Sequence, residues 1–221
     1  SGTTPARVIL QFTATQTTTR IRAYRDSASA TNGQTVIVDN VSVKLAVPDR
    51  SYKGRGLQVV GTLSRAVVNT GNDLAAFSGF SAANYIEQPY NPDLDFGTGD
   101  FSIVVWLKTT DATAASRYML DRTDSHTSPT AGRLRLLMDS SHRAAFWPRD
   151  ATTDYFATGT TALNDGGAHQ IVAQRRGSNL ELHVDGRLEE TVAITAGGNF
   201  SNTLASLFVG IRQDLASQWF V

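Results

Sequence analysis

Residues 179–194, NLELHVDGRLEETVAI, decide how the rest of the chain is read. Apolar and polar residues alternate in both halves of this stretch, and Asp185-Gly186 separates the halves. A two-residue loop between twisted antiparallel strands favours positive φ at both positions, which glycine adopts freely and aspartate tolerates. The stretch therefore predicts a β-hairpin. Because each strand has one apolar side, we expect the hairpin to belong to a sheet that packs against a second layer.

Residues 101–109, FSIVVWLKT, are the most apolar strand candidate in the chain. One face would carry Phe101, Ile103, Val105 and Leu107, and the other would carry Val104 and Trp106. Apolar residues on both faces predict a central strand that is covered on both sides. Further short strand-like runs are separated by polar turns, and no segment has a convincing helical pattern. The chain is therefore expected to be all-β.

Three motifs in this part of the chain resemble the laminin G-like, or concanavalin A-like, family. They are G-x-FSI-x-x-W at residues 99–106, D-G-x-x-H at residues 165–169, and the strand-DG-strand hairpin, in the order found in the family. The family often has Trp before the histidine of the second motif, where this chain has Ala168. The resemblance implies an antiparallel jelly-roll β-sandwich over about residues 46–221.

The chain is expected to consist of two incomplete domains joined by a linker. Residues 34–45, QTVIVDNVSVKL, resemble the closing strand of the β-jelly roll found in carbohydrate-binding modules. We assign residues 1–45 to the C-terminal strands of such a module, 46–56 to a Pro- and Gly-containing linker, and 57–221 to a laminin G-like sandwich without its final strands. Incomplete sheets leave apolar side chains uncovered. We therefore expect six residues to be exposed or covered by another chain: Val36, Val38, Val41, Val43, Trp219 and Phe220.

The composition excludes several classes of protein. The 221 residues contain no cysteine, which excludes disulfide bonds and thiolate metal sites. No apolar run approaches the ~18 to 20 residues that a membrane-spanning helix needs, so membrane insertion is not expected. Residues 1–65 carry nine Lys and Arg against three Asp, a net charge of +6, but Arg20, Arg22 and Lys44 alternate as a solvated strand face would. Nucleic-acid binding is therefore not expected either.

Local catalytic patterns are missing from the sequence. It contains no G-x-S-x-G motif, and its four histidines lack metal-ligand spacing. The nearest carboxylate pairs, Glu181 with Asp185 and Asp93 with Asp95, do not match the E-x-D-x-x-E pattern of glycoside hydrolases with this fold. We therefore expect that the protein is not an enzyme. The alternative is a glycoside hydrolase or polysaccharide lyase of the concanavalin A-like fold, with carboxylates supplied by different strands.

Aromatic and arginine residues are the candidate binding groups. Sugars present apolar C–H faces that stack on aromatic rings, while their hydroxyl groups need fixed polar partners. The residues predicted to meet these needs at one rim are Tyr118, Arg122, Trp147, Arg149 and Tyr155. In the alternative reading, Trp147 and Tyr155 simply pack under their loops.

A calcium site is the one cofactor prediction. Asp121 and Asp124 lie in the stretch DRTDSHTSPTAG, residues 121–132. Carboxylates in loops at a sandwich rim suit a hard cation that takes six to eight oxygen ligands. The laminin G-like resemblance implies calcium at such a rim, and these two aspartates are the expected ligands.

The expected function is a non-catalytic adhesion, binding or structural module of a larger protein. The stretch NYIEQPYNPDLDFGTGDF, residues 84–101, together with the fold also resembles tail and fibre proteins of bacteriophages. This resemblance implies a virion, or otherwise an extracellular bacterial surface, as the location. The expected partners are a cell-surface glycan, other subunits of a larger assembly, or further copies of the chain in a homo-oligomer.

Overall fold

The computed structural model describes residues 56–67, 75–127, 129, 131–195, 197–215 and 218–220. The predicted module of residues 1–45, with Val36, Val38, Val41 and Val43, lies outside the described residues. All but the last residue of the predicted linker lies outside them as well, so the domain division stays a prediction. In the described ranges the regular structure is antiparallel β-sheet with one short 3-10 helix, which confirms the all-β prediction.

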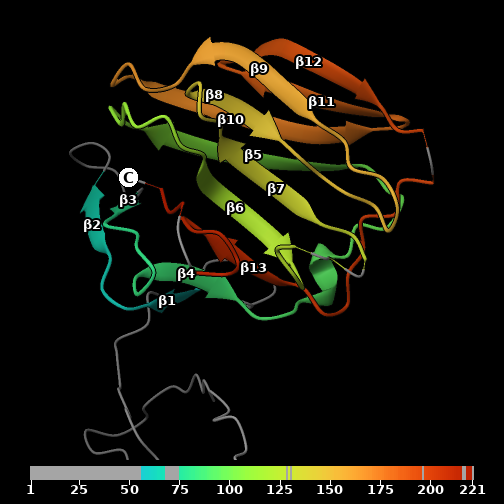
Figure 1. The fold of residues 1–221 in the computed structure, drawn as a ribbon, viewed down its shortest axis with the longest axis horizontal. Coiled ribbons are helices and arrows are strands. Elements are labelled where there is room, and N and C mark those ends of the chain that lie inside the picture. Colours follow the sequence, from blue (N-terminus) through green and yellow to red (C-terminus); the bar gives the residue numbers. More distant parts are fainter. Residues whose placement is uncertain are drawn as a thin grey trace, which may run out of the picture. The chain divides into compact units, whose positions relative to one another are not determined.

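The larger sheet has seven strands in the order β1-β4-β13-β6-β7-β8-β9, and each neighbouring pair is antiparallel (Figure 1). Their bounds are β1 Gln58–Val60, β4 Tyr85–Gln88, β13 Ser206–Val209, β6 Arg117–Thr123, β7 Leu134–Met138, β8 Arg143–Phe146 and β9 Ala157–Ala162. This sheet joins strands from both ends of the described sequence.

The smaller sheet has four antiparallel strands in the order β12-β11-β10-β5. Their bounds are β5 Phe101–Lys108, β10 Ala168–Arg176, β11 Asn179–Val184 and β12 Arg187–Ala193. Strands β2 (Ser64–Val67) and β3 (Ala75–Ser78) form a separate two-stranded ribbon, and the 3-10 helix η2 spans Pro92–Leu94. No helix in the described ranges has the length and apolar character needed to cross a membrane.

The predicted hairpin is confirmed as β11 and β12. Asp185 and Gly186 have φ values of 51° and 78°, so both central residues take the positive φ that the tight loop requires. The Asp185 carboxylate also binds the imidazole of His169 on β10 at 2.7 Å, and Asp165 binds the other ring nitrogen at 3.1 Å. The turn is therefore tied to the neighbouring strand as well as closed by its own backbone.

The core lies between the two sheets, where alternate residues of the strands meet. Strands β8 and β9 pack over β11 and β12. The largest apolar side chains with no exposed surface include Leu136, Met138, Phe146, Ile171, Leu180 and Leu182. They come from both sheets and belong to one cluster, so they form the interior of a β-sandwich.

The prediction that residues 101–109 form a central strand covered on both sides is wrong. Strand β5 lies at the edge of the smaller sheet, and Val104 and Trp106 are 55% and 66% exposed. Among the described strands, β7 is instead covered on both faces, since all five of its residues are buried. A run with apolar residues on both faces has the same pattern in either position, because periodicity does not report what covers a face.

The prediction that Trp219 and Phe220 are exposed is also wrong. Both are half-buried: Phe220 packs against the main core, and Trp219 packs against a second cluster that contains Tyr85 and Phe208. The backbone continues the larger sheet here, since Tyr118 N–H donates to Gln218 O at 3.1 Å and Phe220 N–H donates to Gly210 O at 2.8 Å.

Candidate functional site

The candidate site lies on the face of the seven-stranded sheet that points away from the core, which we call the outer face. A row of cross-strand neighbours crosses it: Phe208, Asp121, Arg135, Trp147 and Phe156. Pairing of β13, β6 and β7 sets the first three residues, and the bond from Trp147 N–H to Arg135 O, at 2.8 Å, adds the fourth. The row therefore brings charged and aromatic side chains together on one surface.

The middle of the row is a buried ion pair. The Arg135 Nε–H donates to Asp121 Oδ1 at 2.9 Å, and the side chains are 6% and 0% exposed. The backbone N–H of Gln213 donates to the second oxygen of Asp121 at 3.0 Å. Burial raises the pKa of Asp121, while the guanidinium of Arg135 and this N–H oppose the rise. Asp121 is thus enclosed by protein donors.

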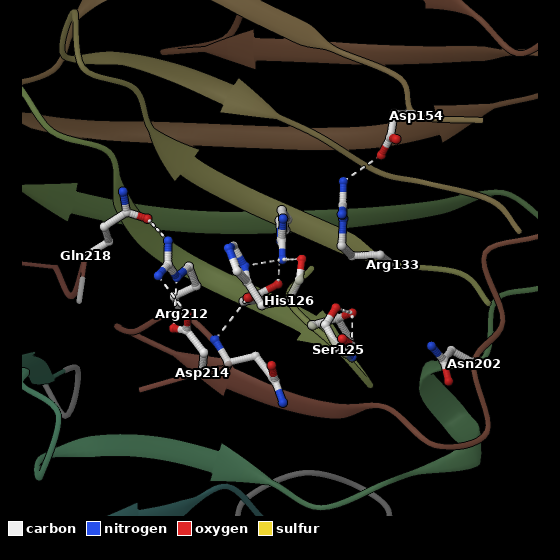
Figure 2. Close-up of polar contacts among 12 residues, drawn as sticks. Ser125, His126, Arg133, Asp154, Asn202, Arg212, Asp214 and Gln218 are labelled. Atoms are coloured by element: carbon white, nitrogen blue, oxygen red, sulfur yellow. Dashed lines mark hydrogen bonds and ion pairs between the residues drawn. The ribbon is translucent and has the colours of Figure 1, made fainter. Parts of the chain in front are cut away.

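Arg135 also holds His126. Its Nη2 donates to His126 Nδ1 at 2.7 Å and to the His126 carbonyl at 3.2 Å. Burial, followed by the charge of Arg135, lowers the pKa of His126, so its ring is neutral at pH 7 and Nδ1 acts as the acceptor. Figure 2 shows His126 in this network, with the Arg212–Asp214 pair and the Arg133–Asp154 pair drawn nearby.

Aromatic side chains form the second part of the outer face. Trp147 is half-buried against Tyr118, Leu137 and Ala145, where the small Ala145 leaves room for the indole ring. Phe156 meets Trp147 in a T-shaped contact with 5.6 Å between ring centroids, and it is 57% exposed. A large apolar ring is thus presented to solvent but held from below by a second ring.

A fork of two arginines on one aspartate forms the third part. Arg133 Nη2 lies 2.6 Å from Asp154 Oδ1, and Arg149 Nη1 binds the other oxygen of Asp154. Backbone bridges join Arg133 to Arg149 and Arg149 to Asp154, so the three side chains are cross-strand neighbours. Burial, followed by the charge of Arg135, lowers the pKa of Arg133.

The turn that carries this fork is held by Asp150. Its Oδ1 accepts the N–H groups of Thr152 and Thr153 at 2.8 and 2.7 Å, and its Oδ2 accepts the hydroxyl of Tyr155 at 3.0 Å. These bonds fix the loop between β8 and β9. The loop in turn fixes Arg149, Asp154 and Phe156.

Three of the five predicted binding residues, Tyr118, Trp147 and Arg149, lie on the outer face. Arg122 and Tyr155 do not. Arg122 follows Asp121 in β6, so strand alternation turns it to the other face, where it is 1% exposed and binds Asp95 at 2.5 Å. Tyr155 is 4% exposed in the main core and packs on the ring of Phe200. For Tyr155 the alternative interpretation, packing under its loop, describes the structure.

Sequence reasoning missed Arg133, Arg135, Asp154, Phe156 and His126 as members of this surface. The signal for the first two was present, because the alternation R-L-R in residues 133–135 places both arginines on one strand face. No comparable signal joined Asp154 to them. Its place near Arg133 depends on two backbone bridges, one from Arg133 to Arg149 and one from Arg149 to Asp154.

The two predicted calcium ligands have different protein partners. Asp121 binds Arg135 and Gln213, whereas Asp124 Oδ1 accepts the side-chain amide of Asn202 at 2.9 Å. Within the described ranges, no three or more His, Asp or Glu side chains gather as metal ligands would. The calcium site therefore stays a prediction from sequence.

Comparison with known proteins identifies the fold. A sequence model described as the Concanavalin A-like lectin/glucanases superfamily, Laminin_G_3, matches residues 80–220. No curated protein matches the chain in sequence.

Solved structures with this fold come from distant proteins. The binding domain of Paraclostridial Mosquitocidal Protein 1 has a TM-score of 0.58 at 12% identity, over 74% of this chain and 41% of that one. Domains LG4-5 of the mouse laminin alpha1 chain have a TM-score of 0.51 at 14% identity, over 62% of this chain and 34% of that one. Domain 4 of the arabinanase AbnA from Geobacillus stearothermophilus has a TM-score of 0.51 at 13% identity, over 71% of this chain and 73% of that one. The chain thus spans about a third of the laminin chain and about two fifths of the mosquitocidal chain.

Proposed function

Since the chain belongs to the concanavalin A-like lectin/glucanases superfamily, we propose that its β-sandwich is a non-catalytic module that binds glycans on the outer face of the seven-stranded sheet. The exposed ring of Phe156, braced by Trp147 next to the Arg149–Asp154 pair, is the observation that carries this proposal. A sugar ring can stack its C–H face on the phenyl ring, and its hydroxyl groups can bond to the fixed guanidinium and carboxylate.

A relative in structure supports the ligand class. Domain 4 of the Geobacillus stearothermophilus arabinanase was solved in complex with arabinotriose. That is a property of the arabinanase domain, and it comes to this chain only as part of the proposal.

The state of the carboxylates favours binding over hydrolysis. A glycoside hydrolase needs one carboxylic acid and one carboxylate on either side of the bond that is cleaved. On the outer face, Asp121 has no exposed surface and Asp154 is held between two guanidiniums. A carboxylate enclosed by donors is poorly suited to transfer a proton or attack a sugar, so we assign these groups a structural part.

We further propose that the module belongs to a larger phage tail or fibre protein, or to a bacterial surface protein, and so acts on a virion or outside the cell. This part rests on residues 84–101 of the sequence and on the fold. Mass spectrometry of purified virions and of cell-surface fractions, from the organism that encodes the chain, would test it. Recovery of its peptides only from the cytosol would refute it.

The binding proposal is tested with a glycan array and the whole 221-residue chain. The variant Phe156→Ala removes the exposed ring, and Trp106→Ala is the matched control because Trp106 is 66% exposed on the other sheet. We expect Phe156→Ala to weaken binding of the recognised glycan about tenfold, or ~1.4 kcal/mol, and Trp106→Ala to leave it unchanged.

Three results would refute the proposal. The first is no array signal for the wild-type chain with or without calcium. The second is loss of binding in Trp106→Ala but not in Phe156→Ala. The third is release of new reducing or unsaturated sugar ends from a bound glycan, which would identify the chain as a hydrolase or a lyase instead.

A further inference from the structure

We propose that the glycan recognised on the outer face is acidic, and that its carboxylate or sulfate group lies against Arg149 and Arg133. This inference rests on the proposed function and narrows its ligand class. It follows from three observations on the same surface: a local excess of positive charge around the arginines, nitrogen donors that have no acceptor, and an exposed ring beside them.

The charges around the two-arginine fork do not balance locally, although the outer face also carries Glu87 on β4, which lies opposite Phe208 and two strands from Asp121. Strands β6 and β7 and the loop after β8 present three guanidiniums, those of Arg133, Arg135 and Arg149, but only two carboxylates, those of Asp121 and Asp154. The net charge of these five side chains is therefore +1. The nearby Arg212–Asp214 pair is neutral as a pair, and the lowered pKa of His126 leaves that ring uncharged at pH 7.

Asp150, the other carboxylate of the loop after β8, does not remove this excess. Its oxygens accept the Thr152 and Thr153 N–H groups and the Tyr155 hydroxyl, and Tyr155 belongs to the core between the sheets. Asp150 keeps its negative charge, but its bond to Tyr155 places it on the core side of the loop, so the excess among the groups on the outer face remains. Neighbouring like charges repel one another. The pKa of Arg133 is accordingly lowered, by burial first and by the charge of Arg135 second.

The donors outnumber the acceptors as well. The Nε–H groups of Arg133 and Arg149 and the indole Nε1–H of Trp147 are buried and have no hydrogen-bond partner in the described part of the chain. Asp154 already accepts from both arginines, one to each oxygen. All three unpaired groups are donors, so the surroundings of the fork favour an acceptor. Because these three atoms are buried, the contact falls to the guanidinium of Arg149, whose side chain is 23% exposed, and an oxyanion fits it better than a neutral hydroxyl.

The position of Phe156 tells which kind of anion fits. Its 57% exposed ring contacts Trp147, and Trp147 is two residues from Arg149 on the same strand face. A free inorganic anion would use the arginines and leave the ring unused. A sugar ring that carries an acidic substituent uses both, because it can stack on Phe156 and place the acid at the guanidinium.

The test compares acidic and neutral forms of one glycan by isothermal titration calorimetry on the whole chain. Oligogalacturonate and its methyl ester have the same sugar chain and differ in the charge of the carboxyl group and one methyl group on it, and dextran sulfate with dextran forms the sulfate arm. We expect at least one acidic form to bind at least tenfold more tightly than its neutral counterpart. The arm that shows this difference identifies the acidic group.

Variants locate the effect. Arg149→Gln should remove the preference for the acidic form and keep the weaker binding of the neutral form. Arg149→Lys, which keeps the charge but not the planar guanidinium, should retain part of the preference. It replaces Arg149→Gln as the test if that variant fails to fold. Arg187→Gln, at an exposed arginine of β12 in the other sheet, is the control and should change nothing.

The outcomes separate this inference from the proposed function. Equal binding of acidic and neutral forms overturns the acidic preference and leaves glycan binding standing. An equal loss in Arg149→Gln and Arg187→Gln also overturns it, because it shows diffuse attraction to charge. Binding of none of these four glycans overturns the acidic preference, and the glycan array described above then decides separately on glycan binding.

Discussion

Replacing Asp121 by Asn is expected to destabilise the fold by about 3 kcal/mol. The change keeps the shape of the side chain and removes one charge of a pair that is 0% and 6% exposed at 2.9 Å. Removing one partner of a buried ion pair typically costs about 3–5 kcal/mol, because the other charge stays buried without compensation. We expect the lower end of this range, since Arg135 keeps two acceptors on His126.

The measurement is urea unfolding at pH 7, with the slope m checked so that a change in midpoint reports stability. Asp214→Asn is the matched control. It breaks the Arg212–Asp214 pair, in which the aspartate side chain is 29% exposed, and such pairs contribute only about 0.2–1 kcal/mol. In thermal unfolding, a loss of about 3 kcal/mol corresponds to a fall in Tm of roughly 6–12 °C for a domain of this size.

The partner variant Arg135→Met tests the same ion pair through the direction in which stability changes with pH. It leaves the buried Asp121 carboxylate without its cation, so the folded-state pKa of Asp121, which burial already raises, should rise further above its unfolded value of about 3.9. A group with a raised folded pKa destabilises the fold as pH rises through that pKa, so the variant should be less stable at pH 7 than at pH 5, relative to wild type. A loss below 1 kcal/mol in Asp121→Asn, or a loss in Arg135→Met that grows on acidification, would refute this account of the outer face.

Three other predictions concern the scaffold. In urea unfolding, Gly210→Ala should destabilise the fold by more than about 2 kcal/mol, because Gly210 has a φ of +80° and a Cβ there would lie 2.1 Å from a ring carbon of Phe80. Gly177→Ala is the control: Gly177 has a φ of +58° but open space around it, so the change should cost only about 1 kcal/mol. Although burial opposes it, bonding to two aspartates raises the pKa of His169, so its contribution should be full below the unfolded pKa of about 6.5 and lost as pH rises through the folded pKa. His169→Gln should abolish that pH dependence of the urea midpoint, and an unchanged profile would contradict it. Leu182→Ala, at a site with no exposed surface, should cost about 2–5 kcal/mol by the same assay.

The sequence was sufficient to predict those features that depend on a few neighbouring residues. The Asp185-Gly186 turn, the alternation in β11 and β12, and the motifs around β5 and β10 predicted the hairpin and the laminin G-like fold correctly. Turn geometry and the two-residue repeat of a strand act over a few neighbouring residues, so the sequence encodes them directly. The same repeat also states which residues share a face, as it does for Arg133 and Arg135.

What covers a face depends on the order of strands, and the tertiary structure alone decided it. The apolar strand β5 became an edge with Trp106 exposed, while β7, with two arginines near its start, became the strand covered on both sides. A short irregularity in β6, between Tyr118 and Leu120, also decided that Tyr118 and Asp121 share the outer face and Arg122 does not. These outcomes depend on pairing between segments far apart in the sequence, and no local pattern records that pairing.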